Sequence, residues 1–182
     1  MSPQRTYGST AKLLHWAIVG LLVLQYAIGF LMPDIHRGML PGTPMNIHMS
    51  IGFIVLLLIV VRLVWRITHP ITPDSSLPPW QQTSSEGVHW LLYLLVLATT
   101  LTGWIFASMR GWTIFLFWMV PLPRLVAEGS ALGRTIGQWH ETLIWVLLVA
   151  IGTHVLAALM HLFVYKDRVM QRMLPGTNRV QQ

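Results

Sequence analysis

Apolar runs separated by polar connections predict four membrane-spanning helices. Each run offers about twenty mostly apolar residues, the length that a helix needs to cross a bilayer core of about 30 Å. The four runs extend from Leu13 to Met32, Met45 to Val64, His89 to Met109, and Trp139 to Val164. We therefore expect an all-α membrane protein in which one four-helix transmembrane bundle forms a single domain over residues 1–182.

The connections between these runs have the composition of loops. Proline and glycine recur through residues 33–44, and proline recurs between Pro70 and Ser85, so both stretches are predicted loops. The third connection, residues 110–138, contains GWTIFLFWMVPLP, whose apolar part of about ten residues is too short to span. We interpret it as an interfacial segment on the membrane surface. No small-residue cleavage site follows the first run, which favours a retained span over a removed signal peptide.

Composition agrees with a membrane protein and limits its chemistry. Of 182 residues, 54% are hydrophobic and 10% charged, which is too apolar for a soluble domain of this size. The chain has no cysteine, which excludes disulfides, iron–sulfur clusters and haem attached covalently through cysteine. The net charge of +6 comes from basic residues scattered among apolar segments, so we expect no nucleic-acid partner. The lipid bilayer is the expected surrounding.

The distribution of Lys and Arg predicts that both termini are cytoplasmic. With that orientation the cytoplasmic side would hold eight basic residues and the opposite side four, as the positive-inside rule requires. The eight are Arg5, Lys12, Arg62, Arg66, Lys166, Arg168, Arg172 and Arg179, and the four are Arg37, Arg110, Arg124 and Arg134.

Four histidines form two pairs when their depths are compared. His140 and His154 lie fourteen residues apart, so they share a helix face and are separated by about 21 Å along the axis. On the predicted topology His48 lies near the outer face, level with His140, and His15 lies near the inner face, level with His154. Because a porphyrin iron takes one imidazole above and one below, the pattern predicts two non-covalent haem b groups with bis-histidine ligation.

Other interpretations of the histidines stay open. A histidine in a membrane helix can simply hydrogen-bond a neighbouring helix, as in a non-redox structural or transport protein. His36 and His69 fall in predicted loops and are expected to be solvated. His89 and His161 fall toward the inner side, where they would face lipid headgroups or contact a quinone headgroup and exchange protons with it. Several glycines would either admit flat macrocycles or allow close helix packing: Gly20, Gly29, Gly52, Gly103 and Gly152.

The roles of the arginines also have two interpretations. Arg62, Arg66 and Arg110 lie at span ends, where haem propionates or lipid phosphates would accept them. On the outer side the basic residues outnumber the acidic ones, so a mild positive field there would draw a small anion toward the outer haem. The residues that would guide such an anion are Arg37, Arg110, Arg124 and Arg134. No catalytic residue is identified.

The chain resembles the prokaryotic cytochrome b561 family over nearly its whole length. The resemblance rests on LLHW from Leu13, NIHMSIG from Asn46, RLVWR from Arg62, HWLLYLL from His89, WHETL from Trp139, THVLAALMH from Thr153 and YKDRVMQRMLPG from Tyr165. It implies a multi-pass protein of the bacterial inner membrane whose axial ligands are His15, His48, His140 and His154.

The resemblance also implies an activity. Superoxide oxidation on the periplasmic side, with electrons delivered to ubiquinone, is characterised in the family and is the leading expectation here. Similar helix and histidine patterns recur in the cytochrome b subunits of hydrogenases and formate dehydrogenases. The alternative is therefore a cytochrome b electron-transfer subunit of a partner dehydrogenase or hydrogenase, which would take electrons from a one-electron donor other than superoxide.

Overall fold

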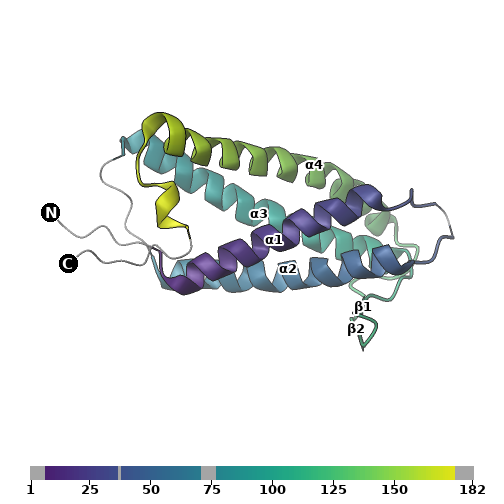
Figure 1. The fold of residues 1–182 in the computed structure, drawn as a ribbon. Coiled ribbons are helices and arrows are strands. Elements are labelled where there is room, and N and C mark those ends of the chain that lie inside the picture. The colour runs from purple at the N-terminus through teal and green to yellow at the C-terminus, as the bar shows by residue number, and fades with distance from the viewer. Residues whose placement is uncertain (1–6, 37, 71–76, 175–182) are drawn as a thin grey trace.

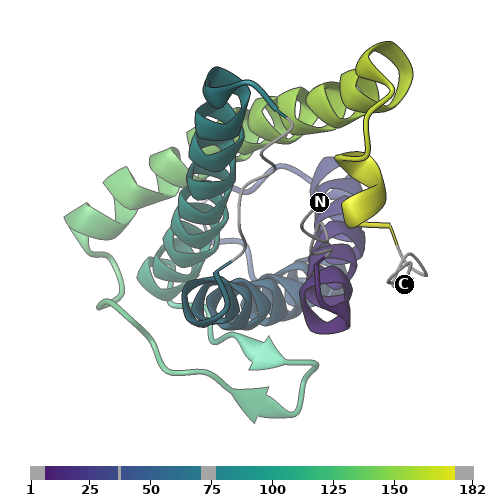
Figure 2. The same ribbon diagram turned by 90° about the vertical axis from the view of Figure 1, so that its left-hand side faces the viewer.

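Four long helices form the bundle in the computed structural model, which describes residues 7–36, 38–70 and 77–174 (Figure 1). The helices are α1 (Ser9–Leu31), α2 (Thr43–Thr68), α3 (Pro79–Met109) and α4 (Ala131–Met160). All four are long and apolar enough to cross a membrane, which confirms the predicted all-α four-helix fold. Along the bundle, α1 packs on α2, α2 on α3, and α3 most closely on α4 (Figure 2).

The two ends of the bundle are named here for what lies at each. The terminal end holds the start of α1 and the end of α4, and the hairpin end holds the start of α2 and a short β-hairpin (Figure 1). The hairpin pairs β1 (Phe115–Leu116) with β2 (Val120–Pro121) in antiparallel register. His15 and His154 belong to the terminal half of the bundle, whereas His48 and His140 belong to the hairpin half.

All four helices begin earlier than the hydropathy pattern predicts, α3 and α4 by the largest margins. Helix α3 starts at Pro79, with proline in its first turn, so the polar residues 79–85 are helical although we expected a loop there. Helix α4 starts at Ala131, where the Ser130 side chain caps it by accepting from the Gly133 amide. The prediction that residues 131–138 belong to a connection is therefore wrong. Of the predicted loop after α2, residues 71–76 lie outside the described part.

The third connection is folded against α2 rather than lying free. Ser50 of α2 is fully buried, and its Oγ lies 3.0 Å from the Phe115 carbonyl and accepts from the Phe117 amide at 3.0 Å. The hairpin turns at Phe117 and Trp118, both with positive φ (46° and 61°). That conformation is uncommon for bulky residues, and the Ser50 contacts hold the backbone in it. That the third connection lies on the membrane surface stays a prediction.

After α4 the chain turns back toward α1. A π-helical turn, η1 (His161–Tyr165), ends at Lys166 in the left-handed conformation, and the short 3₁₀ helix η2 (Met170–Arg172) follows. The Trp16 indole donates to the Met173 carbonyl at 2.9 Å, and Lys12 Nζ donates to the Leu174 carbonyl at 3.1 Å. The segment after α4 therefore lies beside the start of α1 at the terminal end (Figure 2).

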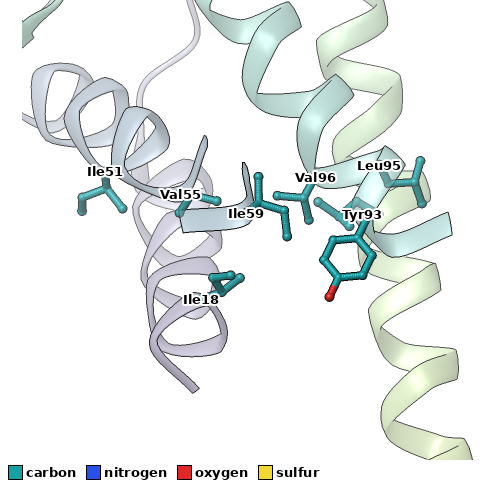
Figure 3. Packing of buried hydrophobic residues seen from close by; sticks show 8 residues of the cluster. Ile18, Ile51, Val55, Ile59, Tyr93, Leu95 and Val96 are labelled. Atoms are coloured by element: carbon teal, nitrogen blue, oxygen red, sulfur yellow. The ribbon is translucent and has the colours of Figure 1, made fainter. Parts of the chain in front are cut away.

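An apolar layer occupies the middle of the bundle. Side chains from all four helices meet there, with Val55 fully buried and Leu147 2% exposed. The cluster consists of Ile18, Ile51, Val55, Ile59, Tyr93, Leu95, Val96 and Leu147, most of which Figure 3 labels. Since Leu147 lies midway along α4 between His140 and His154, this layer separates the two halves of the bundle that carry the histidine pairs.

Close packing of α3 on α4 depends on glycine, and we expect Gly137→Ala to destabilise the fold. A Cβ at Gly137 would lie 2.2 Å from Phe106 Cδ2, which cannot be accommodated without movement of that ring. Overpacking of this kind costs about 1–3 kcal/mol, more than the gain in helix propensity of about 1 kcal/mol. The measurement is the thermal unfolding midpoint in detergent. Gly20→Ala is the control, because no described side chain or neighbouring helix lies within 4 Å of a Cβ there, and an equal response of both variants would contradict the packing argument.

Candidate functional site

His48 and His140 line one cavity in the hairpin half of the bundle. Its volume is about 610 Å³, within the range of cofactor and ligand sites in proteins. Helices α1 to α4 all contribute to its wall, and its small or polar lining residues include Gln25, Gly29, Gly52, Thr99, Gly103, Gly137 and Glu141. The predicted outer pair is therefore brought to a common space from two different helices.

A backbone carbonyl of α3 orients His140. Its Nδ1 lies 2.8 Å from the Thr99 carbonyl oxygen, so Nδ1 carries the proton and donates it there. Histidines that bind metals commonly donate their second ring N–H to a carbonyl, which fixes the tautomer and frees the other nitrogen for the metal. The ring sits directly on Gly103, where a Cβ would lie only 2.8 Å from His140 Cε1. This arrangement leaves Nε2 as the nitrogen that can bind iron.

His48 is placed similarly, but its Nδ1 forms no hydrogen bond within the described part of the chain. Its Cε1 lies 4.0 Å from where a Cβ would stand at Gly29 of α1. Its Nδ1 is buried and has no hydrogen-bond partner among the described residues, and the same holds for Gln25 Oε1 and Thr99 Oγ1. All three residues line the cavity. Buried polar atoms in proteins are nearly always paired, so this concentration of unpaired atoms marks a site built around another group.

At the terminal end His15 and His154 face each other across the bundle. Their ring centroids are 6.4 Å apart, with the ring planes at 79°. Two metal–imidazole bonds of about 2 Å, extended by the radii of both rings, give a centroid separation of about 6 Å. The His89 ring is also close to His154, at 5.4 Å, so both separations lie near that span. His15 stays the predicted counterpart of His154, and His89 lies beside the pair.

These donor sets suit a porphyrin better than a bare metal ion. Within the part of the chain that the structure describes, no three His, Asp or Glu side chains converge as an ordinary metal site requires. A haem needs only two imidazoles, and each half of the bundle supplies at least two. The oriented His140, the glycine beneath its ring and the unpaired atoms around the cavity fit such a group.

His161 has a partner that sequence reasoning missed. Its Nδ1 lies 2.5 Å from Asp167 Oδ2, and Asp167 Oδ1 also accepts from the Val169 amide at 3.0 Å. The π-helical turn and the left-handed Lys166 bring these two residues together. Because no regular helix joins residues six apart, the spacing alone carries no signal for this pair.

The predicted anion-guiding arginines have different surroundings. Arg110 donates to the His36 carbonyl, and its guanidinium lies over the Phe106 and Trp112 rings at 5.7 and 4.9 Å. Arg124 lies 3.6 Å from Glu128, so much of its field is offset. Arg134 is exposed in the first turn of α4, and Arg37 lies outside the described residues.

Arginines and histidines outside the pairs make local contacts. Arg62 donates to the Ala11 carbonyl of α1 at 2.8 Å, and Arg66 lies over the Trp90 ring. His36 is exposed, and His69 stacks on Trp65.

Sequence reasoning also missed Gln25, which lines the cavity, although a lone amide within the apolar run LLVLQYAIGF is itself a signal.

Comparison with known proteins identifies the family. The family model described as prokaryotic cytochrome b561 matches residues 6–176. Cytochrome b561 homolog 2 of Escherichia coli is 29% identical, covering 95% of this chain and 93% of its own. A probable superoxide oxidase, CybB, of Yersinia pestis is also 29% identical, over 89% and 92% of the two chains. Cytochrome b562 of Cereibacter sphaeroides is 27% identical, over 96% and 98%.

The match extends across all four helices and both histidine pairs. Together with the four spans, it makes this chain a multi-pass electron-transfer protein of the bacterial inner membrane that binds haem b. The chain belongs to the prokaryotic cytochrome b561 family.

Proposed function

We propose that the protein binds two haem b groups and oxidises superoxide at one membrane face while reducing ubiquinone at the other. The observation that carries this proposal is the presence of two level histidine pairs, His48 with His140 and His15 with His154, in opposite halves of one bundle. Along α4 the two levels are about 21 Å apart. The similarity to the probable superoxide oxidase of Yersinia pestis supports superoxide as the donor.

The four histidines would hold both groups through bis-histidine ligation. Bound haem would supply one-electron transfer, and because both imidazoles of each pair would be engaged in holding it, superoxide would react without binding the iron. Two superoxide ions would each lose one electron to become O₂, and one ubiquinone would take both electrons and two protons to become ubiquinol. The apolar layer around Val55 and Leu147 excludes water between the two levels.

We also propose that the hairpin end faces the periplasm and the terminal end the cytoplasm, as the distribution of Lys and Arg predicts. Arg110 and Arg134 then contribute positive charge at the hairpin end, and Arg124 contributes less because of Glu128. Asp34 and Glu141, which line the cavity, oppose part of this charge. A positive field of this kind raises the rate at which a small anion arrives, and salt screens it. The rate with superoxide should therefore fall as ionic strength rises.

At the terminal end, His161 and Asp167 are our candidates for proton exchange with the quinone. The hydrogen bond to Asp167 uses His161 Nδ1 and leaves Nε2 as the nitrogen for a quinone carbonyl. Asp167 would stabilise the imidazolium as a proton passes. His89, beside His154, is the second candidate contact.

We expect His161→Ala to slow ubiquinol formation without removing haem. General acid–base groups contribute about 100-fold or more to such steps, so re-oxidation of the reduced protein by a short-chain ubiquinone should slow on that order. Asp167→Asn, which keeps the oxygen that accepts from Val169, should have an intermediate effect. The exposed His36→Ala is the matched control and should behave as wild type. Unchanged re-oxidation in His161→Ala would remove this residue from the quinone site.

Stopped-flow mixing with superoxide tests the proposed function as a whole. The purified, oxidised protein in lipid nanodiscs should show haem reduction on mixing, and added ubiquinone should be converted to ubiquinol. Superoxide dismutase should abolish both signals. If dithionite reduces the haems but superoxide does not, the protein is instead an electron-transfer subunit that serves a partner dehydrogenase. A protein that binds no haem would support the non-redox alternative.

A further inference from the structure

Gln25 is a polar residue in an otherwise apolar part of α1, and its side chain lines the cavity that holds His48 and His140. Its Oε1 is buried and accepts no hydrogen bond from any described residue. Leaving a buried amide oxygen unpaired costs about 1–3 kcal/mol. An amide is therefore an unfavourable choice at this position unless another group in the site uses it.

His48 supplies the complementary atom. When an imidazole binds a metal through Nε2, its neutral form carries the proton on Nδ1, which then needs an acceptor. For His140 that acceptor is the Thr99 carbonyl, at 2.8 Å. His48 Nδ1 is buried and has no partner among the described residues. One member of the outer pair thus has its orienting bond. The other lies near the Gln25 backbone carbonyl, but its Nδ1 forms no hydrogen bond with a described residue.

The position of both side chains brings the Gln25 amide to the His48 ring, beside the Gln25 backbone carbonyl that also lies near it. The His48 ring edge faces α1, since its Cε1 lies 4.0 Å from the Cβ position of Gly29, one helical turn beyond Gln25. Gly52, one turn beyond His48 on α2, leaves room for the amide, because a Cβ there would lie 3.1 Å from Gln25 Nε2. Thr99 Oγ1 also has no partner among the described residues, but it belongs to α3, on the residue whose carbonyl already accepts from His140.

We infer that Gln25 is a positioning residue for His48, whose Nδ1–H donates to Gln25 Oε1 when Nε2 is engaged by the cofactor. The inference rests on the proposed role of His48 as an axial ligand. An acceptor on the distal N–H makes a ligating imidazole more basic and holds its ring in one orientation. Gln25 would therefore tune the electron affinity of the outer haem only, because His15 and His154 lie in the other half of the bundle.

Redox titration of the two haems, combined with their low-spin electron paramagnetic resonance signals, tests this inference in the purified holoprotein. Gln25→Met keeps the length of the side chain and removes the acceptor. We expect it to raise the midpoint potential of the outer haem and to shift that haem's resonance signal. The affinity of the protein for the outer haem should fall about tenfold, which would appear as loss of haem during gel filtration. Gln25→Glu restores an acceptor, and the potential should return to or fall below the wild-type value. Leu22→Met, on the same helix and cavity wall, is the matched control.

Three results would overturn the inference. The first is a Gln25→Met protein with two haems and unchanged potentials and signals, which would mean that a backbone carbonyl suffices, as it does for His140. The second is an equal shift of both haems, or an equal shift in Leu22→Met, which would indicate general packing. The third is a Gln25→Glu protein in which the midpoint potential of the outer haem is as high as in Gln25→Met. A wild-type protein without haem would instead disprove the proposed function, so the two failures are distinguishable.

Discussion

Replacing His140 by alanine should remove about half of the bound haem and leave the other half spectroscopically normal. His140 is held at the outer cavity by its bond to the Thr99 carbonyl, and no other histidine lines that cavity except His48 among the described residues. The remaining haem should be the one between His15 and His154, whose ring centroids lie 6.4 Å apart at the terminal end. The measurement is the haem-to-protein ratio together with the low-spin resonance signals of the purified variant.

His154→Ala gives the reciprocal experiment. It should retain the signal that His140→Ala loses, and lose the one that His140→Ala retains. His36→Ala, an exposed histidine on the connection between α1 and α2, should keep both haems. If either His140→Ala or His154→Ala kept its full haem content, the ligand assignment would be incorrect.

A single methyl group at Gly103 is expected to have an effect nearly as large. The added Cβ would lie 2.8 Å from His140 Cε1 and 3.1 Å from Nδ1, so the ring has to move and its bond to the Thr99 carbonyl is disturbed. Overpacking costs about 1–3 kcal/mol, which exceeds the propensity gain of about 1 kcal/mol from replacing glycine in a helix. We expect Gly103→Ala to lose most of the outer haem and to keep the inner one.

Gly29→Ala is the matched control for this substitution. It lies beneath the other histidine of the outer pair, but its Cβ would lie 4.0 Å from His48 Cε1, an ordinary contact distance. It should therefore keep both haems. Loss of outer haem in Gly29→Ala, with retention in Gly103→Ala, would reverse the geometry described here.

The spans and the histidine pairing could be predicted because both depend on simple periodicity. Apolar runs long enough for a bilayer identify helices without knowledge of their packing, and the rise per residue places His140 and His154 at two depths. The helix starts could not be read from hydropathy, because residues 79–88 and 131–138 are mixed or polar in composition. Pro79 and Ser130 are start signals of other kinds, and attention to them would have corrected both boundaries.

The finer parts of the site depend on tertiary contacts that local patterns do not encode. The Thr99 carbonyl is invisible in a sequence, since every residue has one. Phe117 and Trp118 adopt positive φ without the glycine or asparagine that usually indicates such a turn, so the hairpin was not predicted. The contact between His161 and Asp167 requires a π-helical turn and a left-handed Lys166, neither of which the sequence indicates.

The central claim is that one chain holds two haem b groups, each between two histidines. Its most direct test is the haem content per polypeptide of the purified protein, measured as the pyridine haemochrome against amino-acid analysis. The account predicts about two non-covalent b-type haems per chain, as two bis-histidine sites require. One haem or none in fully folded protein would contradict it.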